Sequence, residues 1–228
     1  MMLNYQETPT YEVVDPQTQM AGVRLLIKRE DLNHPFASGN KWWKLKYNLQ
    51  EAISKNFDKL LTYGGSFSNH IVVTAAAAHE LGLKSIGIIR GEQAFPLNPI
   101  LSFAMSRGMD LHYISRSAYR TKSQADDFLK QFGNCYWIPE GGSNFLAVKG
   151  VIEFASTLDR PYDYLCCPVG TGGTLSGLIE GTSPEKKIIG FSVLKGGEFL
   201  VQEIQKLSEK SKQRSNWHLI NDYHFGGY

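Results

Sequence analysis

Short apolar runs alternate with helical patterns along the middle of the chain. Four apolar runs predict strands, at residues 59–63, 85–89, 110–114 and 135–138. Helical patterns lie between them, at residues 72–81, 99–106 and 117–132. Near-continuous apolar strands separated by helices are typical of a parallel sheet that is covered on both faces. We therefore expect these elements to form one lobe, covering residues 55–150.

A second group of elements follows the first. The pattern predicts a helix over 144–157, strands over 164–169 and 187–193, and an amphipathic helix over 198–212. This group should pack with the N-terminal segment, so that residues 1–54 and 151–228 form a larger lobe. The sequence therefore predicts an α/β fold of two lobes, built on open, twisted parallel sheets covered by helices.

Composition places the chain among ordinary globular proteins. Its 228 residues are 42% hydrophobic and 20% charged, with a formal net charge of +2. That balance provides no basic field for nucleic acid, and no apolar stretch approaches the ~20 residues that a membrane span needs. Residues 1–16 lack a basic segment followed by an apolar core, so a secretory signal is not expected.

The cysteines suggest neither disulfides nor a metal site. Cys135, Cys166 and Cys167 are odd in number and lie in apolar runs, which is typical of reduced core residues. Neither Cys-x-x-Cys nor His-x-x-x-His spacing occurs in the sequence. We therefore expect a cytoplasmic protein without a metal.

The most informative stretch is Ser38-Gly39-Asn40-Lys41-Trp42-Trp43-Lys44-Leu45, which begins an amphipathic helix directly after a turn. Asn40 is expected to be the N-cap of this helix. A lysine at a helix start lies at the positive end of the helix dipole, which lowers its pKa. Such an amine can attack a carbonyl and form a Schiff base. The alternative is that Lys41 and Lys44 are ordinary solvated residues.

A glycine-rich turn, Gly170-Thr171-Gly172-Gly173-Thr174, follows an apolar strand and precedes a helical pattern. Backbone N–H groups at a helix N-terminus bind anions, most often phosphate. The spacing fits neither the Walker pattern nor the dinucleotide fingerprint. The sequence therefore predicts a phosphate site without a nucleotide signature, and a purely structural turn is the alternative.

Two further Gly-Gly turns follow predicted strands. In the first, Gly64 and Gly65 precede Ser68 and Asn69, which either cap the next helix or face a ligand at the carboxyl end of the sheet. The second, residues 138–144, either forms a conformational turn or lines the same cleft. A reactive lysine, a phosphate site and such turns together suit a cofactor with one phosphate and one aldehyde, which is pyridoxal phosphate.

Four motifs occur in order along the chain: Lys28-Arg29-Glu30-Asp31, Ser38-Gly39-Asn40-Lys41-x-x-Lys44-Leu45, Gly64-Gly65-x-x-Ser68-Asn69-His70 and Val169-Gly170-Thr171-Gly172-Gly173-Thr174. In these motifs the chain resembles the 1-aminocyclopropane-1-carboxylate deaminase and D-cysteine desulfhydrase family. Its members are pyridoxal-phosphate enzymes of the tryptophan-synthase β-subunit fold type (fold type II). The resemblance covers nearly the whole chain.

The resemblance implies roles for the residues that match. Lys41 would be the Schiff-base lysine, and Lys44 would contact the cofactor phosphate, which lies in the loop of residues 170–174. Asn69 would hydrogen-bond the phenolic oxygen of the cofactor. Ser68 would lie beside the substrate carboxylate and take part in catalysis, with Asn69 and His70 also in the substrate site.

The C-terminal residues resemble a family segment that carries an active-site tyrosine, which maps best to Tyr228. Family members continue beyond this point, so we expect the C-terminal part of the larger lobe to be missing here. The chain also departs from the family at Phe67, where glutamine is usual, and at Val72, a frequent arginine position. Both departures concern the choice of substrate.

The reaction implied is deamination with β-elimination from a small amino acid. D-cysteine would give pyruvate, ammonia and sulfide. The cyclopropane substrate would need a nucleophile or base at Ser68, Tyr228 or Lys41 to open its ring. The alternatives are another lyase or dehydratase of the same fold type, and a truncated chain without catalytic activity. The resemblance also implies a homodimer.

Overall fold

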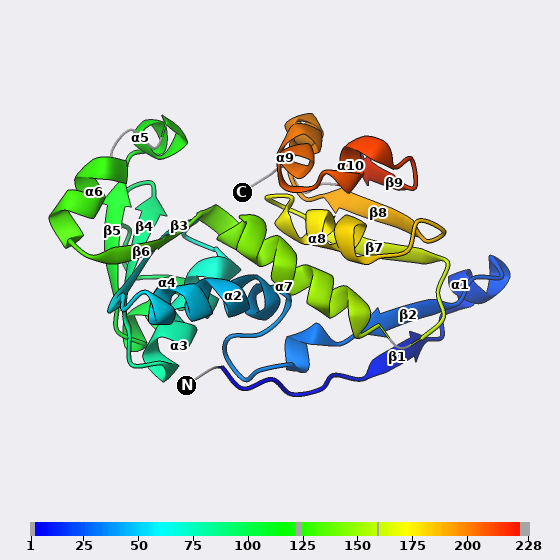
Figure 1. Ribbon diagram of the computed structural model, residues 1–228, viewed down its shortest axis with the longest axis horizontal. Coiled ribbons are helices and arrows are strands. Elements are labelled where there is room, and N and C mark those ends of the chain that lie inside the picture. Colours follow the sequence, from blue (N-terminus) through cyan, green and yellow to red (C-terminus); the bar gives the residue numbers. More distant parts are fainter. Residues whose placement is uncertain (1–2, 122–124, 159, 224–228) are drawn as a thin grey trace.

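The computed structural model describes residues 3–121, 125–158 and 160–223. Within these residues the strands form three sheets, of two, four and three strands. The four-stranded and three-stranded sheets lie at opposite sides of the molecule, with helices α2 (Asn40–Ser54) and α7 (Phe145–Ser156) between them (Figure 1). The predicted α/β class is therefore confirmed.

The four-stranded sheet is parallel throughout, with the strand order β5-β4-β3-β6. Its strands are β3 (Lys59–Gly65), β4 (Lys84–Arg90), β5 (Met109–Ile114) and β6 (Cys135–Ile138). Its helices are α3 (Asn69–Glu80), α4 (Pro99–Ser106), α5 (Arg116–Thr121) and α6 (Ala125–Phe132). All four predicted strands are confirmed. The single helix predicted over 117–132 is described as two helices, on either side of residues outside the described part.

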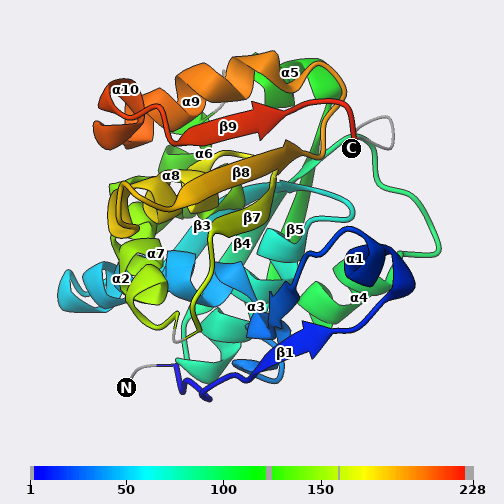
Figure 2. The same ribbon diagram turned by 90° about the vertical axis from the view of Figure 1, so that its right-hand side faces the viewer.

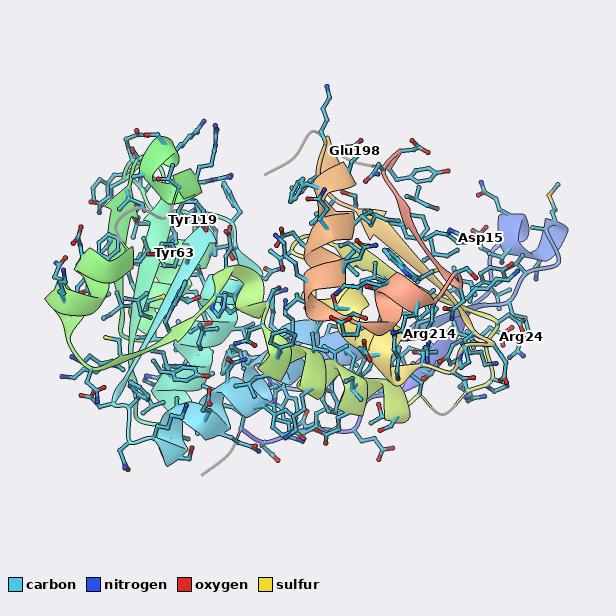
Figure 3. The ribbon with its side chains drawn as sticks, turned by 45° about the horizontal axis from the view of Figure 1, so that its top comes forward. Asp15, Arg24, Tyr63, Tyr119, Glu198 and Arg214 are labelled. Atoms are coloured by element: carbon cyan, nitrogen blue, oxygen red, sulfur yellow. The ribbon has the colours of Figure 1, made fainter. Side chains whose placement is uncertain are left out.

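Both faces of this sheet are buried, as the continuous apolar runs predicted. One face packs against α3 and α4 through a cluster that includes Ile71, Ala75, Ile89, Leu101 and Ala104. The other packs against α5 and α6 through a cluster that includes Leu61, Tyr63, Ile88, Tyr119 and Phe128. On that second face the rings of Tyr63 and Tyr119 lie together, with their centroids 5.8 Å apart (Figure 3).

The three-stranded sheet is also parallel, and its strands are β7 (Tyr164–Val169), β8 (Lys187–Ser192) and β9 (Trp217–Ile220). Figure 2 shows them stacked in that order, with β9 uppermost. The predicted strands at 164–169 and 187–193 are confirmed, whereas β9 was not predicted. Helix α8 (Gly173–Gly181) follows β7 directly.

The prediction of one helix over 198–212 is wrong. The segment consists of a 3-10 turn η3 (Gly197–Phe199) and two helices, α9 (Leu200–Leu207) and α10 (Lys210–Gln213). The break lies at Ser208, whose backbone is extended at φ −136° and ψ 113°. Its hydroxyl donates to the Glu180 carboxylate at 2.7 Å, and this contact from outside the segment opposes a continuous helix.

One face of the three-stranded sheet is open to solvent. Along β7 the side chains alternate, with Tyr164, Cys166 and Pro168 exposed and Val169 buried. Successive residues of a strand point to opposite faces, so Cys166 faces outward. The prediction that all three cysteines are core residues is therefore wrong, although all three are free thiols.

An antiparallel pair, β1 (Thr10–Val13) and β2 (Leu25–Lys28), lies near the N-terminus. The short helix α1 (Pro16–Met20) connects the two strands, and the 3-10 turn η1 (Glu30–Leu32) leads from β2 towards α2. Among the described residues, no helix combines the length and the apolar character that crossing a membrane would require.

Helix α7 packs closely against α2 on one side and against α8 on the other. A Cβ atom at Gly150 in α7 would lie 1.9 Å from the backbone oxygen of Trp43 in α2. A Cβ atom at Gly177 in α8 would lie 2.3 Å from Cβ of Val151 in α7. Glycine at both positions allows the close approach, because any larger side chain would separate the helices. This packing fixes the beginning of α2 relative to the beginning of α8.

Candidate active site

Lys41 lies in the first turn of α2, as the sequence predicted. The helix begins at Asn40, and Gly39 occupies the cap position without a side-chain hydrogen bond, so the prediction of Asn40 as N-cap is wrong. The Asn40 side chain instead contacts the beginning of α8, where its Nδ2 donates to Oγ1 of Thr174 at 2.8 Å. Its Oδ1 accepts a hydrogen bond from Nζ of Lys41 at 3.3 Å. Asn40 therefore joins Lys41 to the glycine loop of residues 170–174.

The pKa of Lys41 is low, as predicted. Burial lowers it from 10.5 to about 8, because a charged ammonium loses hydration in the protein interior. The cause is therefore desolvation, whereas the sequence predicted an effect of the helix dipole. About half of the Lys41 side chains would carry a neutral, nucleophilic amine at pH 8.

Lys44 lies one turn further along α2 and is 1% exposed. Its Nζ donates to Oγ of Ser143 at 2.9 Å. Burial, and then the charge of Lys41, hold the pKa of Lys44 well below its usual value. Among the residues that the structure describes, no carboxylate forms an ion pair with Lys44. A buried ammonium without a counter-charge is costly, and an anion bound beside it would remove that cost.

The glycine loop supplies a place for that anion. The backbone of Gly172 is left-handed at φ 83°, a conformation that favours glycine, and α8 begins at the next residue. A Cβ at Gly173 would lie 3.1 Å from Nζ of Lys44 and 2.7 Å from Oγ of Ser143. The first N–H groups of α8 therefore open beside the buried lysine. This arrangement fits a phosphate group, and the predicted strand-turn-helix placement of residues 170–174 is confirmed.

Ser143 is a contact residue that the sequence analysis did not select. Its hydroxyl meets Lys44, and it also lies 2.6 Å from Oγ1 of Thr171 in the glycine loop. It follows the second Gly-Gly turn, for which a role in lining the cleft was one of two open alternatives. The repetition of Gly-Gly turns after strands was the sequence signal that could have identified it.

The turn between β3 and α3 carries Ser68 and Asn69. A Cβ at Gly64 would lie 2.4 Å from Cγ1 of Ile71, so the glycine lets α3 begin close to the strand. Ser68 occupies the N-cap position of α3, but its side chain makes no capping hydrogen bond. The capping role offered for Ser68 is therefore wrong. Ser68 is half-buried and Asn69 is exposed, both at the carboxyl end of the sheet.

His70 is 1% exposed, at the start of α3. Its Nε2 lies 2.9 Å from Oγ1 of Thr62, which donates its own hydrogen to the carbonyl of Ile138. Nε2 must therefore donate, which leaves Nδ1 as a bare acceptor without a partner among the described residues. Burial, followed by the charges of Lys41 and Lys44, keeps the pKa of His70 well below 6.5. Because Nδ1 is buried as well, a substrate in contact with the surface of the site would not touch this side chain directly.

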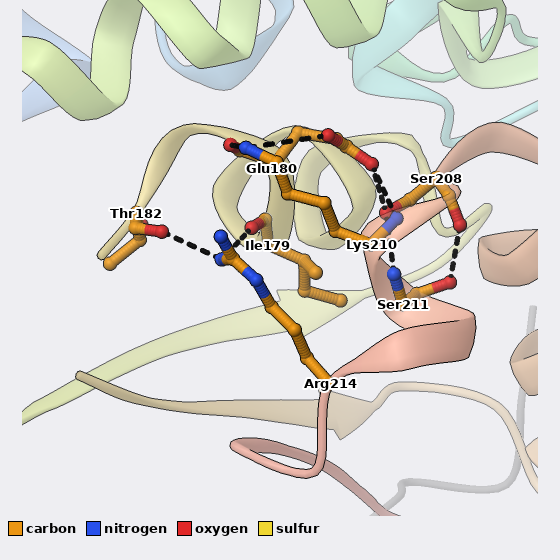
Figure 4. A network of polar contacts seen from close by, with 7 residues as sticks. All are labelled: Ile179, Glu180, Thr182, Ser208, Lys210, Ser211 and Arg214. Atoms are coloured by element: carbon orange, nitrogen blue, oxygen red, sulfur yellow. Dashed lines mark hydrogen bonds and ion pairs between the residues drawn. The ribbon is translucent and has the colours of Figure 1, made fainter. Parts of the chain in front are cut away.

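The far end of α8 is held by a separate polar network (Figure 4). Nη1 of Arg214 donates to the carbonyl oxygens of Ile179 and Thr182, both at 2.8 Å. The Glu180 carboxylate accepts from the backbone N–H of Lys210 at 2.9 Å. Positive groups at the C-terminus satisfy free carbonyls and oppose the negative end of the helix dipole. This network fixes the helix whose other end begins in the glycine loop of residues 170–174.

Tyr228, the last of the predicted site residues, lies outside the described residues. In the described part, no group of three or more His, Cys, Asp or Glu side chains is arranged to hold a metal ion. The structure thus brings together Lys41, Lys44 and the loop 170–174. It places Ser68 and Asn69 after β3, at the carboxyl end of the four-stranded sheet.

The family described as pyridoxal-phosphate dependent enzyme matches residues 1–223 of the chain. A Thermotoga maritima protein, provisionally named a 1-aminocyclopropane-1-carboxylate deaminase, is 30% identical over 99% of this chain and 78% of its own length. An Arabidopsis thaliana protein, named a bifunctional D-cysteine desulfhydrase and 1-aminocyclopropane-1-carboxylate deaminase, is 31% identical over 82% of this chain and 52% of its own.

Two solved structures resemble this chain. The crystal structure of a homologue of 1-aminocyclopropane-1-carboxylate deaminase superimposes with a TM-score of 0.83 at 28% identity, covering 99% of this chain and 74% of the other. An L-serine ammonia-lyase from Rhizomucor miehei superimposes with a TM-score of 0.64 at 17% identity, covering 87% and 64%. The second likeness concerns the fold alone.

Proposed function

The chain belongs to the family of pyridoxal-phosphate dependent enzymes, and we propose that it deaminates a small amino acid, with D-cysteine as the first candidate. One observation carries the proposal. Lys41, with a pKa of about 8, is joined through Asn40 to Thr174 of the phosphate loop, and the buried Lys44 faces the same loop. A lysine that reacts with an aldehyde thus lies beside a site that fits its phosphate.

Several residues would hold the cofactor. Lys41 would attach it through its amine, while Lys44 and the first N–H groups of α8 would bind the phosphate. Asn69, exposed at the start of α3, would reach its phenolic oxygen. Bound pyridoxal phosphate supplies an electron sink for negative charge at the α-carbon of the substrate.

The remaining steps fall to side chains of this chain. The neutral amine of Lys41 would accept the proton from the α-carbon, since its pKa of about 8 leaves about half of the side chains unprotonated at pH 8. Ser68 would orient the substrate carboxylate from the N-terminus of α3, where the helix dipole favours a negative charge. His70, a buried neutral imidazole next to Asn69 in the first turn of α3, would help to fix the positions of Ser68 and Asn69.

Between the two candidate substrates, we favour D-cysteine over 1-aminocyclopropane-1-carboxylate. Elimination of sulfide from D-cysteine requires a single base, for which Lys41 suffices, and water then converts the eliminated product to pyruvate and ammonia. Opening the cyclopropane ring requires an additional nucleophile or base, because that substrate has no hydrogen on its α-carbon. Within this proposal the protein acts as a cytoplasmic homodimer of two-lobed subunits, in which residues 1–54 and 151–228 form one lobe and residues 55–150 the other, so that the boundaries fall at the end of α2 and within α7. Light scattering would test the dimer.

The decisive experiment is an absorbance scan of the protein with added pyridoxal phosphate. We expect a band near ~410–430 nm, the region typical of a lysine-bound cofactor, and borohydride should fix the pyridoxyl group on Lys41. A Lys41→Ala variant should lack the band, whereas Lys55→Ala, at an exposed lysine after the same helix, should retain it. Absence of the band from the unmodified protein would contradict the proposal. Turnover of D-cysteine would then distinguish an enzyme from a protein that only binds the cofactor.

A further inference from the structure

Two side-chain amides face each other between helices α2 and α7, which lie side by side in the middle of the molecule (Figure 1). Asn48 lies one turn after Lys44 in α2 and is 0% exposed. Its Nδ2 donates to Oδ1 of Asn144 at 3.2 Å, and Nδ2 of Asn144 donates to Oδ1 of Asn48 at 2.7 Å. Asn144 is the N-cap of α7 and directly follows Ser143. A reciprocal pair of hydrogen bonds therefore joins the two helices beside Ser143.

Neighbouring backbone groups fix the orientation of both amides. Nδ2 of Asn48 also donates to the carbonyl oxygen of Lys44 at 2.8 Å. Oδ1 of Asn144 also accepts from the backbone N–H of Ala147 at 2.9 Å. A carbonyl oxygen can only accept and an N–H can only donate, so neither amide can turn over without losing a bond. The reciprocal pair follows from these two orientations.

The turn before Ser143 needs such contacts, because its own sequence specifies it weakly. It is the 3-10 turn η2 (Glu140–Gly142), in which Gly141 and Gly142 have left-handed backbones at φ 63° and 67°. Two consecutive glycines allow many backbone conformations. Contacts from other elements therefore decide where Ser143 lies.

Lys44 is held at both ends by the segment that follows this turn. Its carbonyl oxygen accepts from Asn48, which is paired with Asn144. Its Nζ donates to Oγ of Ser143 at 2.9 Å, and Ser143 also lies 2.6 Å from Oγ1 of Thr171 in the glycine loop. The direction of the Lys44 side chain towards the loop thus depends on two consecutive residues, 143 and 144.

Helix packing alone would not require an amide at position 48. Its neighbours Leu45, Leu49 and Ala52 on α2 are buried and apolar, and an apolar side chain of similar size would also join the helices. A buried amide gains little net stability, because its hydrogen bonds replace those it made with water. Hydrogen bonds are directional, however, so the pair fixes a position that apolar contact would leave variable.

We propose that Asn48 and Asn144 are positioning residues of the phosphate site. Their reciprocal pair fixes the segment 143–144 against α2, so that Oγ of Ser143 holds Nζ of Lys44 beside the glycine loop. Both residues act through Ser143 and Lys44. The inference rests on the proposed function in that it takes Lys44 and the loop 170–174 to bind phosphate.

Two variants remove the pair from opposite sides. Asn48→Leu replaces the buried amide with an apolar side chain of similar size. Asn144→Ser keeps a capping hydroxyl for α7 and removes the amide, so it tests the same contact if Asn48→Leu does not fold. Tyr47→Phe is the matched control. The Tyr47 hydroxyl joins the same two helices by donating to Glu153 at 3.1 Å, more than two turns along α7 from Asn144.

Hydrogen exchange in the cofactor-free protein measures the position of the turn directly. The reporter is the peptide 139–144, in which the amide of Gly142 donates to the carbonyl of Pro139 at 2.8 Å. For Asn48→Leu and Asn144→Ser we expect about fivefold faster exchange, the effect of losing about one net hydrogen bond. Tyr47→Phe should stay within about twofold of the unmodified protein.

The Kd for pyridoxal phosphate, from tryptophan fluorescence, distinguishes positioning from general stabilisation. Asn48→Leu should weaken binding about fivefold when Ser143 is present. In a Ser143→Ala background the same change should weaken it by less than about twofold, because the amide pair acts through the Ser143 hydroxyl. A residue that only stabilises the fold would weaken binding by the same factor in both backgrounds.

Exchange within twofold of the unmodified protein in either amide variant would overturn the inference. An equal acceleration in Tyr47→Phe would also overturn it, and so would an equal loss of affinity with and without Ser143. The proposed function fails in a different way, since the unmodified protein would then bind no pyridoxal phosphate. In that case the exchange measurement still decides whether the amide pair holds the turn.

Discussion

Nδ2 of Asn40 donates to Oγ1 of Thr174 at 2.8 Å, although 134 residues separate them in the chain. Asn40 begins α2 and Thr174 lies in the first turn of α8, so this bond joins the helix that carries Lys41 to the helix that follows the glycine loop. The same Asn40 side chain accepts from Lys41. One amide side chain therefore contacts both Lys41 and the beginning of α8.

A double-mutant cycle of Asn40→Ala and Thr174→Val measures this connection. Each single variant should weaken binding of pyridoxal phosphate, because either change releases the two helix starts from one another. We expect a coupling of about 1 kcal/mol between the two sites in the cofactor Kd, typical of one hydrogen bond. Additive effects would show that the two side chains act independently.

Lys44 should reduce the stability of the cofactor-free protein. Its buried amine donates to Ser143, and it has no carboxylate partner in the described part of the chain. Lys44→Met keeps the length of the side chain and removes the ionisable amine, whose charged form burial disfavours, so it should raise the Tm without cofactor by several degrees, about 1–2 kcal/mol. The same variant should lose most of its affinity for pyridoxal phosphate. A lower Tm in Lys44→Met would contradict the argument from burial.

The reaction of Lys41 with an aldehyde should depend on pH with a midpoint near 8. Only the neutral amine attacks, and burial lowers the pKa of Lys41 to about 8. The rate of borohydride-trapped attachment of pyridoxal phosphate should rise about tenfold per pH unit below the midpoint and level off above it. A rate that continues to rise towards pH 10.5 would indicate an ordinary solvated lysine.

The same shift makes stability depend on pH. Because the pKa of Lys41 is lower in the folded protein, the unfolded chain binds more protons between about pH 8 and 10.5. The contribution of Lys41 to the free energy of unfolding should therefore rise with pH across that window and be constant below it. Denaturant titrations of the cofactor-free protein and of Lys41→Met at pH 7.5 and pH 10 would test this. The free energy of unfolding should increase less between the two pH values in the variant than in the unmodified protein.

Arg214 should contribute to stability more than to binding. Arg214→Ala removes both hydrogen bonds to the carbonyls of Ile179 and Thr182 at the C-terminus of α8 (Figure 4). We expect the free energy of unfolding to fall by about 1–3 kcal/mol, as for other hydrogen bonds from a charged donor. Lys212→Ala, at an exposed ion pair with Glu209, should change it by less than about 0.5 kcal/mol. A similar fall in both variants would contradict the capping role.

Local sequence patterns predicted most of the elements correctly. The four strands of the first sheet and the strand-turn-helix around residues 170–174 follow from apolar runs and glycine placement, which act over a few residues. The single helix over 198–212 was wrong because Ser208 bonds to Glu180, in another element. Strand β9 was missed because its four residues carry a weak pattern of their own.

The sequence by itself determined the chemistry of the site: a lysine at a helix start, a second lysine one turn later and a glycine loop after a strand. The tertiary structure alone decided how these parts act together. Desolvation lowers the pKa of Lys41, and desolvation depends on which elements close over the side chain. Asn40 bonds to Thr174, and Ser143 to Lys44, because α2, α7 and α8 pack closely at Gly150 and Gly177. Contacts between residues about a hundred positions apart leave no local pattern, so only the packed fold reveals them.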